Sequence, residues 1–143
     1  TMFATDFHLP AVQLAQANAR KHKLNNVHFM QAFWLTACQQ NQFDMVISNP
    51  PYIEADDPHL QQGDVRFEPL SALISGPDGL DDIRLITQQA ANCLRPNGWL
   101  LVEHGYDQSV AVQQLFSVAG FSHISAHQDF GGNDRAVMGQ LTL

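Results

Sequence analysis

The stretch Phe43-Asp44-Met45-Val46-Ile47-Ser48-Asn49-Pro50-Pro51-Tyr52 carries the clearest fold signal in the chain. Its first six residues form a short, mostly apolar run, which is typical of a buried strand in a parallel sheet. The two prolines that follow cannot continue the strand, because each lacks a backbone N–H and fixes its own φ angle. The stretch therefore predicts a strand over residues 43–48 that ends at a rigid polar turn.

Strand-like and helix-like segments alternate on both sides of this stretch. Short apolar runs typical of strands occupy residues 2–5, 27–30 and 99–103. Apolar residues at helical spacing occupy residues 9–19, 80–94 and 108–119. Because strands that alternate with helices form parallel sheets, the pattern predicts an α/β fold, with residues 27–30 and 43–48 as buried parallel strands. We expect one domain over residues 1–143.

The C-terminal end departs from this alternation. Two further strands, residues 121–127 and 136–143, flank the turn Gly131-Gly132-Asn133-Asp134 and predict an antiparallel hairpin. Between the central strand and the helix at residues 80–94, residues 50–79 contain five prolines and no sustained period, so we expect a long ordered loop. Loops of that length usually serve function.

Composition excludes several classes of protein. The chain has 45% apolar and 15% charged residues, and no apolar run approaches the ~20 residues of a membrane-spanning helix. Its first residues lack the basic start and apolar stretch of a signal peptide, which favours the cytoplasm. Cys38 and Cys93 form no CxxC pair and are expected to be buried thiols rather than a disulfide. The seven histidines have no zinc-site spacing, so no metal is expected.

The charge distribution argues against a nucleic-acid substrate. The formal charge is −7, and eight of the fourteen acidic residues lie between Glu54 and Asp82, beside the polar turn. Nucleic-acid binders need basic surface to neutralise the phosphate backbone. The same acidic stretch is also consistent with a solvated loop that steers no partner.

The polar turn Asn49-Pro50-Pro51-Tyr52 combines groups that suit the binding of a planar NH2. Ligands of open α/β sheets collect at the carboxyl ends of strands, where this tetrapeptide lies. The prolines remove two donors and leave carbonyl oxygens free to accept bonds, and Asn49 can add a side-chain oxygen. Tyr52 offers a flat face for a planar group. The alternative is a rigid turn in which Asn49 bonds its own backbone, as Asn often does in turns.

These residues resemble a known family. Asn-Pro-Pro-Tyr is the motif of class I methyltransferases that act on planar nitrogens. The downstream segments Asp56-Asp57-Pro58-His59-Leu60, Gly63-Asp64-Val65-Arg66-Phe67-Glu68-Pro69 and Gly79-Leu80 resemble the release-factor N5-glutamine methyltransferases of the HemK/PrmC family. The resemblance extends from Asp6 to the hairpin. It implies a Rossmann-like fold, S-adenosyl-L-methionine as cofactor, and a glutamine of peptide chain release factors as substrate.

The resemblance assigns roles to the tetrapeptide. Asn49 and the Pro50 carbonyl would hold the substrate amide, with Pro51 in the same turn, Tyr52 packed near the amide, and Asn49 also facing the cofactor. The amide nitrogen is a poor nucleophile because its lone pair is delocalised. Two acceptors that fix its N–H groups would orient it toward the methyl group, so orientation would supply most of the catalysis and no general base is assigned.

Three residues near the N-terminus concern the cofactor. Asp6 matches the acidic residue that bonds the ribose hydroxyls of the cofactor in this fold, and its alternative role is a helix N-cap. Trp34 matches an aromatic residue beside the adenine ring, although a tryptophan at this spacing is also an ordinary core residue. Phe33 departs from the family pattern, which has an Asp that could bond the adenine amino group. Adenine recognition would then rely on stacking.

Two further segments invite a functional or a structural interpretation. Glu103-His104-Gly105 follows a strand as the tetrapeptide does, so it could line the same cleft, but an ordinary turn at a strand end is preferred. Arg66 and Glu68 could position the substrate backbone or pair with each other. None of these residues is included in the predicted site.

The resemblance also predicts elements that this sequence does not show. The family's glycine-rich cofactor loop should lie upstream of Asp6, and none of the nine glycines is placed there. Because the sequence opens in what resembles the family's second strand, we expect the first strand and the N-terminal helical domain to be absent too. The missing strand is central in the family's sheet, so two strands should have unpaired edges. We expect a fragment that alone binds the cofactor poorly. Calorimetric titration tests this expectation, and micromolar affinity would contradict it.

Three functions remain open at this point. The first is methylation of a release-factor glutamine. The second is a nucleic-acid methyltransferase acting on adenine N6 or on guanine, against which the acidic loop counts. The third is a non-catalytic remnant of the fold, supported by the absent glycine loop and by Phe33.

Overall fold

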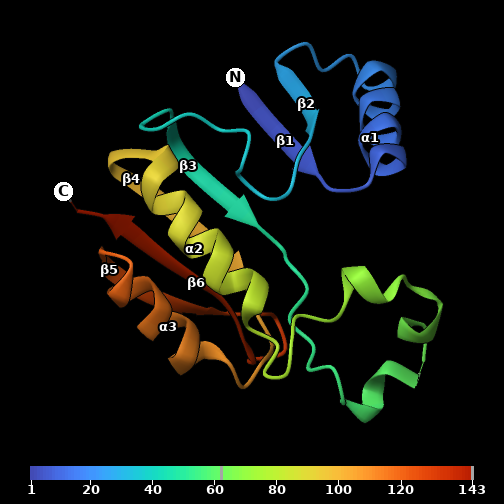
Figure 1. Cartoon of the computed structure of the whole chain (residues 1–143), viewed down its shortest axis with the longest axis vertical. Coiled ribbons are helices and arrows are strands. Elements are labelled where there is room, and N and C mark those ends of the chain that lie inside the picture. The colour runs from blue at the N-terminus through green and yellow to red at the C-terminus, as the bar shows by residue number, and fades with distance from the viewer. Residues whose placement is uncertain (62, 143) are drawn as a thin grey trace. The chain divides into compact units, whose positions relative to one another are not determined.

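The computed structural model describes residues 1–61 and 63–142, apart from the side chains of His59 and Val65, which belong to the segments quoted above. The chain forms two compact units, Thr1–Gln39 and Gln40–Leu143, and each is described by itself. Figure 1 labels their helices and strands in chain order. Alternation of strands and helices confirms the predicted α/β class.

Unit 1 is a single β-α-β element. Strands β1 (Met2–Asp6) and β2 (Val27–Gln31) pair in parallel, and helix α1 (Leu9–Lys21) joins them. Pro10 lies in the first turn of α1, where its missing N–H has no cost. These three elements match their predictions to within two residues.

Unit 2 contains a four-stranded sheet with two helices. Its elements are β3 (Phe43–Ser48), α2 (Asp81–Cys93), β4 (Leu94–Glu103), α3 (Ser109–Val118), β5 (Phe121–Gln128) and β6 (Asp134–Leu141). The strand order is β3-β4-β6-β5, in which β3 and β4 are parallel and β6 is antiparallel to both β4 and β5. The predicted C-terminal hairpin is therefore confirmed.

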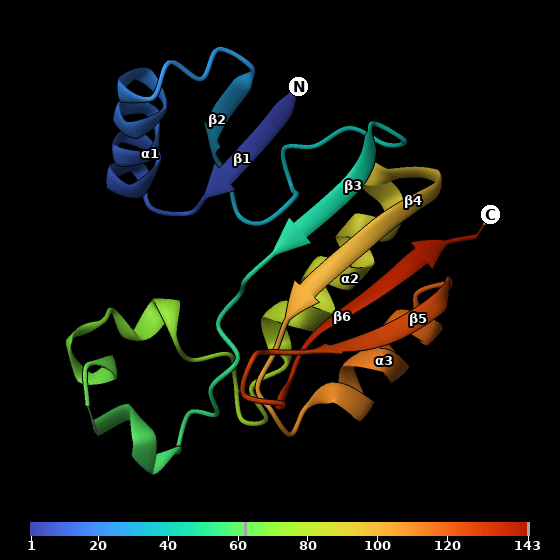
Figure 2. The ribbon, with the colours of Figure 1, turned by 180° about the vertical axis from the view of Figure 1, so that it is seen from behind.

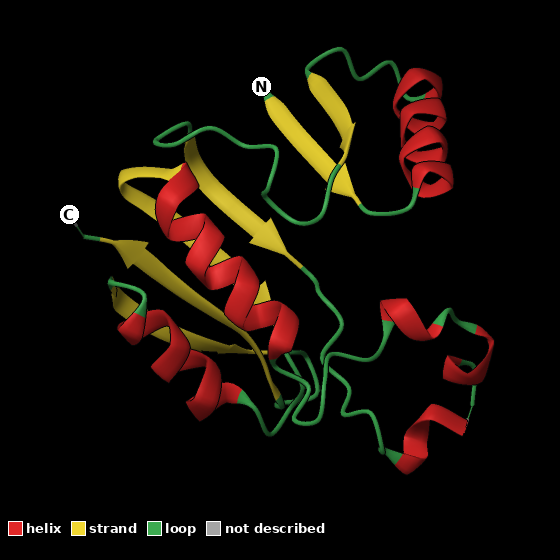
Figure 3. Ribbon diagram, in the orientation of Figure 1, coloured by secondary structure: helices red, strands yellow, loops and turns green. Residues whose placement is uncertain are grey.

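The two helices of unit 2 cover one face of its sheet, as the red ribbons over the yellow strands show (Figure 3). Alternate residues of the strands point to this face and are buried, including Leu100, Val102 and Val137, which have no exposed surface. Phe116 of α3 is also fully buried, and a Cβ atom on Gly139 would lie only 2.8 Å from its ring. The view from behind shows the opposite face without a helix from this unit (Figure 2).

The long segment between β3 and α2 is ordered, as predicted, and contains three short 3₁₀ helices: Pro58–Gln61, Val65–Phe67 and Leu70–Ala72. Its two ends are tied together, because the Ile53 amide donates to the Leu73 carbonyl at 2.9 Å and the Ser75 amide to the Ile53 carbonyl at 3.0 Å. The buried Ser75 hydroxyl then accepts from the Asp82 amide at 2.7 Å, which satisfies one free donor at the start of α2.

Three predictions about burial and boundaries were wrong in part. Strands β2 and β3 were expected to be buried, yet β2 contains no buried residue and β3 has one, Val46. The reason is that β2 bonds to β1 alone and β3 to β4 alone among the described strands, so neither is enclosed by neighbours. Strand β4 also begins at Leu94, five residues earlier than expected.

The remaining departure concerns the cysteines. Neither cysteine forms a disulfide among the described residues; Cys93 is buried, as predicted, whereas Cys38 is only half-buried. The expectation of unpaired strand edges agrees with the topology, since β1 and β3 each have one bonded neighbour in the part of the chain that the structure describes.

Candidate functional site

The tetrapeptide of residues 49–52 leaves the carboxyl end of β3, as expected. The Asn49 side chain is exposed, Pro50 is buried and Tyr52 is half-buried. Among the described residues, neither the Asn49 side chain nor the Pro50 carbonyl has a hydrogen-bond partner, so the alternative in which Asn49 bonds its own turn is wrong. The two predicted acceptors are therefore available to a ligand.

Tyr52 is held by its hydroxyl group, which donates to Oε1 of Glu103 at 3.2 Å. Glu103 ends β4, the parallel neighbour of β3, so the two strand ends bring these residues together. Burial raises the pKa of Tyr52, the charge and hydrogen bond of Glu103 raise it further, and Arg135 opposes the rise. Tyr52 therefore stays neutral near neutral pH and its hydroxyl remains a donor to Glu103.

The backbone of Tyr52 is held by a residue that the sequence did not single out. Nε2 of Gln108 donates to the Tyr52 carbonyl at 3.0 Å and to the Asp78 carbonyl at 3.3 Å. Oε1 of the same side chain accepts from the Gly105 amide at 2.8 Å. A glutamine at the start of a helix is ordinary, so no sequence signal distinguishes it.

The turn Glu103-His104-Gly105 contributes directly to this arrangement, which corrects the preference for an ordinary strand-end turn. Glu103 receives the Tyr52 hydroxyl, and the Gly105 amide is bonded to Gln108. His104 is fully buried, and its Nδ1 lies 2.7 Å from the Gly105 carbonyl, which therefore accepts the ring proton. The position of this turn after a parallel strand was the signal that could have identified it.

Asp6 closes β1 in unit 1 and is exposed. Its Oδ1 accepts from the His8 amide at 2.7 Å, so Asp6 shapes the turn before α1. The N-cap of α1 is His8 rather than Asp6, which corrects the alternative role suggested for Asp6. Its second carboxylate oxygen has no partner in the described part of the chain, and a carboxylate with a free oxygen at a strand end fits the hydroxyl groups of a ribose.

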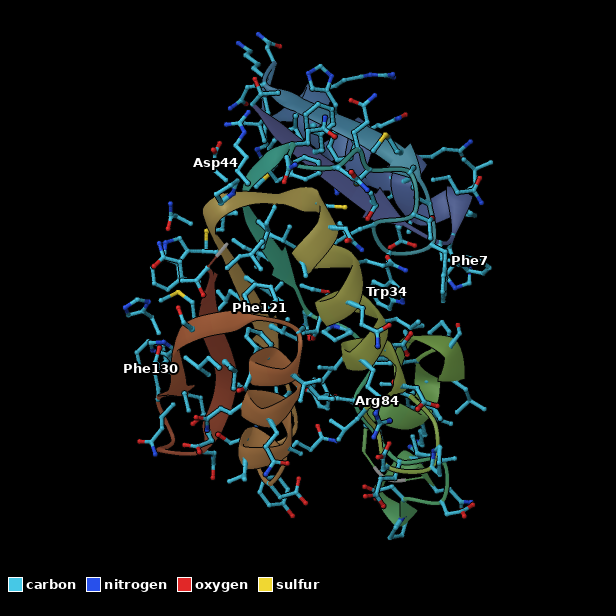
Figure 4. The ribbon with its side chains drawn as sticks, turned by 60° about the vertical axis from the view of Figure 1, so that its left-hand side comes forward. Phe7, Trp34, Asp44, Arg84, Phe121 and Phe130 are labelled. Atoms are coloured by element: carbon cyan, nitrogen blue, oxygen red, sulfur yellow. The ribbon has the colours of Figure 1, made fainter. Side chains whose placement is uncertain are left out.

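Aromatic rings surround the end of β2. Trp34 has a positive φ of 51°, and its carbonyl accepts from the Thr5 hydroxyl at 3.0 Å, which fixes this turn against β1. The Phe33 ring lies 6.1 Å from the Trp34 ring and meets the exposed Phe7 ring edge-on at 5.9 Å between centroids. Phe7 and Trp34 are labelled in Figure 4. Exposed aromatic faces fit an adenine ring by stacking.

The residues predicted for the site thus form two groups, one in each unit. The acceptor group in unit 2 comprises Asn49, Pro50, Pro51 and Tyr52, and the structure adds Glu103 and Gln108 as their supports. The group in unit 1 comprises Asp6 and Trp34, together with the aromatic neighbours Phe7 and Phe33.

The loop residues Arg66 and Glu68 do not pair with each other in the described structure, which excludes one of their two predicted roles. The Arg66 guanidinium carbon instead lies 4.6 Å above the centroid of the Phe67 ring. Phe67 is 75% exposed. A role for these residues in positioning a substrate backbone stays a prediction.

The described residues contain no group of three or more histidine, cysteine, aspartate or glutamate side chains placed to hold a metal ion. In the same residues, no helix is both long and apolar enough to span a bilayer.

Comparison with known proteins places this geometry in a family. The family model described as "Methyltransferase domain" matches residues 1–137. The chain belongs to the methyltransferase domain family. The structure of a methyltransferase from Pyrococcus furiosus covers 99% of this domain with a TM-score of 0.73 and 14% sequence identity. That structural similarity supports the fold, and 62% of the Pyrococcus chain is covered.

Curated relatives give a more specific comparison. This methyltransferase domain is 49% identical over 140 residues to a release factor glutamine methyltransferase of Pseudomonas aeruginosa, covering 98% of this chain and 51% of the relative. It is 46% identical over 139 residues to the protein of the same name from Escherichia coli, covering 97% of this chain and 50% of that relative. The chain therefore spans about half the length of the curated relatives it matches.

Proposed function

We propose that this domain transfers a methyl group from S-adenosyl-L-methionine to the side-chain amide nitrogen of a glutamine in peptide chain release factors. The observation that carries the proposal is the pair of acceptors at the end of β3, the Asn49 side chain and the Pro50 carbonyl, which have no hydrogen-bond partner among the described residues and lie beside Tyr52. The relatives, which are named release factor glutamine methyltransferases, support the choice of glutamine as the methylated group.

The acceptors determine what the chain does in this reaction. The cofactor, when bound, supplies a methyl group whose bond to sulfur breaks as the bond to nitrogen forms, with the bonding pair returning to sulfur. Oδ1 of Asn49 and the Pro50 carbonyl each accept one N–H of the substrate amide, which fixes the amide plane and thereby orients the nitrogen lone pair, perpendicular to that plane, toward the methyl group. One of these protons leaves to solvent as the new bond forms, and no general base is required.

Unit 1 supplies the groups that suit the nucleoside part of the cofactor. Asp6 presents a free carboxylate oxygen to the ribose hydroxyls, and the rings of Trp34 and Phe33 stack on adenine. Phe33 has no hydrogen-bonding group, so it recognises the shape of the base and not its amino group. We propose that the predicted site residues of unit 1 and of unit 2 belong to one catalytic domain.

The remaining features of the proposal concern partners and location. The acidic segment between Glu54 and Asp82 disfavours a nucleic-acid substrate, so the release factor is the partner and DNA is not. Cys38 and Cys93 are not joined by a disulfide in the described part of the chain, which suits the reducing cytoplasm. The reaction requires no metal ion or membrane.

The experiment that tests the proposal incubates the complete gene product with methyl-labelled cofactor and either a release factor or DNA. We expect label on the glutamine of the release factor, located by mass spectrometry of its peptides. Label on the nucleic acid alone would overturn the proposal in favour of a nucleic-acid methyltransferase. A release factor in which that glutamine is replaced by alanine provides the substrate control.

The role of Asn49 is tested by Asn49→Ala in the same assay. The variant loses one acceptor and the orientation that it provides, so we expect kcat to fall on the order of 10²-fold. The exposed Asn18 on α1 provides a matched control, and Asn18→Ala should leave kcat unchanged. Wild-type turnover by Asn49→Ala would exclude Asn49 from the site.

A further inference from the structure

Three loops meet at the side chain of Gln108. Its carboxamide bonds to Tyr52 in the turn after β3, to Asp78 in the turn before α2, and to Gly105 in the turn after β4. These partners lie far apart in the sequence, with separations of 56 residues to Tyr52 and 30 residues to Asp78. Gln108 is therefore the point at which the turn carrying the tetrapeptide is joined to the rest of unit 2.

The chemistry of the three bonds requires an amide. Both hydrogens of Nε2 are donated to carbonyl oxygens, and Oε1 accepts a backbone N–H. A flipped amide would place Oε1 against the two carbonyls and Nε2 against the Gly105 N–H, so every contact would become repulsive. A carboxylate could keep the bond to Gly105 but could not donate to Tyr52 or Asp78.

Gly79 makes this junction compact. Its φ of +69° is in the left-handed region, and an added Cβ atom would collide with the Tyr52 carbonyl oxygen and lie 2.6 Å from Nε2 of Gln108. Only glycine therefore lets the turn before α2 approach both groups. The bond from Gln108 to the Tyr52 carbonyl is partly buried, with the Gly79 backbone close to both groups.

We propose that Gln108 is a positioning residue for methyl transfer, which holds the backbone of Tyr52 and thereby fixes the direction of the adjacent Asn49 and Pro50 acceptors. Pro50 and Pro51 restrict the backbone between the acceptors and Tyr52, so displacement of the Tyr52 carbonyl is transmitted to both acceptors. Glu103 restrains the same residue at its hydroxyl. The inference rests on the proposed function, because it concerns the geometry of the same acceptors.

Two substitutions distinguish positioning from a general contribution to folding. Gln108→Met keeps the length of the side chain and removes all three hydrogen bonds, so kcat should fall about tenfold or more while KM for the release factor changes little. Gln108→Glu keeps the acceptor for Gly105 and loses both donors at neutral pH, so kcat should fall similarly.

The pH profile provides the readout that a merely structural role would not move. Two facing carbonyl dipoles raise the pKa of the introduced carboxyl group, and its protonated form can donate to the Tyr52 carbonyl again. Activity of Gln108→Glu relative to wild type should therefore recover as the pH falls toward about 5, whereas that of Gln108→Met should not. Parallel profiles for the two variants would overturn the proposal.

Hydrogen exchange gives a second readout that needs no substrate. Loss of the Gln108 donors should speed exchange of the Ile53 and Ala55 amides, which are bonded to the Leu73 and Gly76 carbonyls at the base of the same loop. The exposed Gln114 on α3 is the control, since Gln114→Met should leave exchange and kcat unchanged. Wild-type kcat and wild-type exchange in Gln108→Met would contradict the inference.

These readouts separate the inference from the proposed function. If the wild type does not methylate release factor but Gln108→Met still shows faster exchange, the proposed substrate is wrong and the structural junction at Gln108 is supported. If the wild type methylates release factor and Gln108→Met does so at the same rate, the proposed substrate is supported and the positioning role of Gln108 is wrong.

Discussion

Unit 1 and unit 2 carry the predicted site residues, two in unit 1 and four in unit 2, on very different amounts of buried core. In unit 1 the buried apolar side chains among the described residues are Val12 and Ala19, both on α1. Unit 2 buries a continuous set from both helices and the four strands, with Phe116, Ile83 and Leu100 at zero exposure. The acceptor group in unit 2 therefore lies on a well-packed core, whereas Asp6 and Trp34 in unit 1 lie on a small one.

The two units also differ in how tightly they hold their predicted site residues. Tyr52 is restrained at its hydroxyl by Glu103, at the end of β4, and at its carbonyl by Gln108, at the start of α3. The Asp6 side chain is restrained by a single hydrogen bond, from the His8 amide, and it remains exposed. Reactions that depend on orientation need the first arrangement, whereas a ribose can be held by flexible hydrogen bonds.

The largest expected effect tests the difference in packing. Phe116→Ala removes a fully buried ring that lies 5.3 Å from the Phe121 ring, and it should cost about 3–5 kcal/mol in the free energy of unfolding. In unit 1, Phe3 is 40% exposed and stacks on His28, so Phe3→Ala should cost about 1 kcal/mol or less. Urea unfolding followed by circular dichroism measures both. Equal costs would contradict the contrast between the units.

A smaller effect separates binding from stability. Asp6→Asn removes the charge from the proposed ribose acceptor, so cofactor affinity of the complete gene product should fall about tenfold, measured by calorimetric titration. Thermal unfolding should be unchanged, because Asp6 is exposed.

The control for Asp6 is a surface carboxylate in unit 2. Asp44 is labelled in Figure 4 and forms an exposed ion pair with Arg95 at 2.6 Å. Asp44→Asn should change neither cofactor affinity nor turnover. A cofactor affinity that is the same for Asp6→Asn and wild type would exclude Asp6 from the ribose site.

The smallest expected effect is a loss of stability at acid pH that arises from Asp78 in unit 2. Hydrogen bonds from Arg84 hold the pKa of the Asp78 carboxyl below its usual range, so the native state favours the charged form. This contribution is present above the usual carboxyl pKa and is lost as the pH falls through the lowered value. Because both side chains are nearly half exposed, it amounts to less than about 1 kcal/mol.

The measurement compares wild type with Asp78→Asn by urea unfolding at about pH 6 and about pH 2. At about pH 6 the wild type should be more stable than Asp78→Asn, and at about pH 2 the two proteins should be equally stable. A difference that is independent of pH would show that the charge of Asp78 does not contribute.

The elements were predictable from sequence because their signals are local. Apolar spacing over residues 9–19, 80–94 and 108–119 gave three helices close to their observed bounds, and the glycine turn gave the hairpin. Burial of β2 and β3 was not predictable in this way, because it depends on which strands lie beside them. The tetrapeptide was identified from its prolines and its position after a strand.

The supports of the site were harder to predict. Glu103 and Gln108 contact Tyr52 across 51 and 56 residues of sequence. The sequence signal for Glu103 is only its position at the end of a strand, and Gln108 has no local pattern that distinguishes it from other polar residues. The importance of Gly79 follows from a collision with backbone that only three-dimensional coordinates show. Long-range hydrogen bonds of single side chains are thus the part of the site that periodicity cannot reveal.

The free edge of β3 makes protein concentration a variable in the experiments above. Its N–H and C=O groups on that side have no bonded strand among the described residues, and the strand exposes Met45 and Ile47, at 45% and 63%. An open apolar edge is a template on which a second chain can add a strand, so self-association should grow with concentration. Titrations of this chain in dilute solution would keep that edge from competing with the ligand.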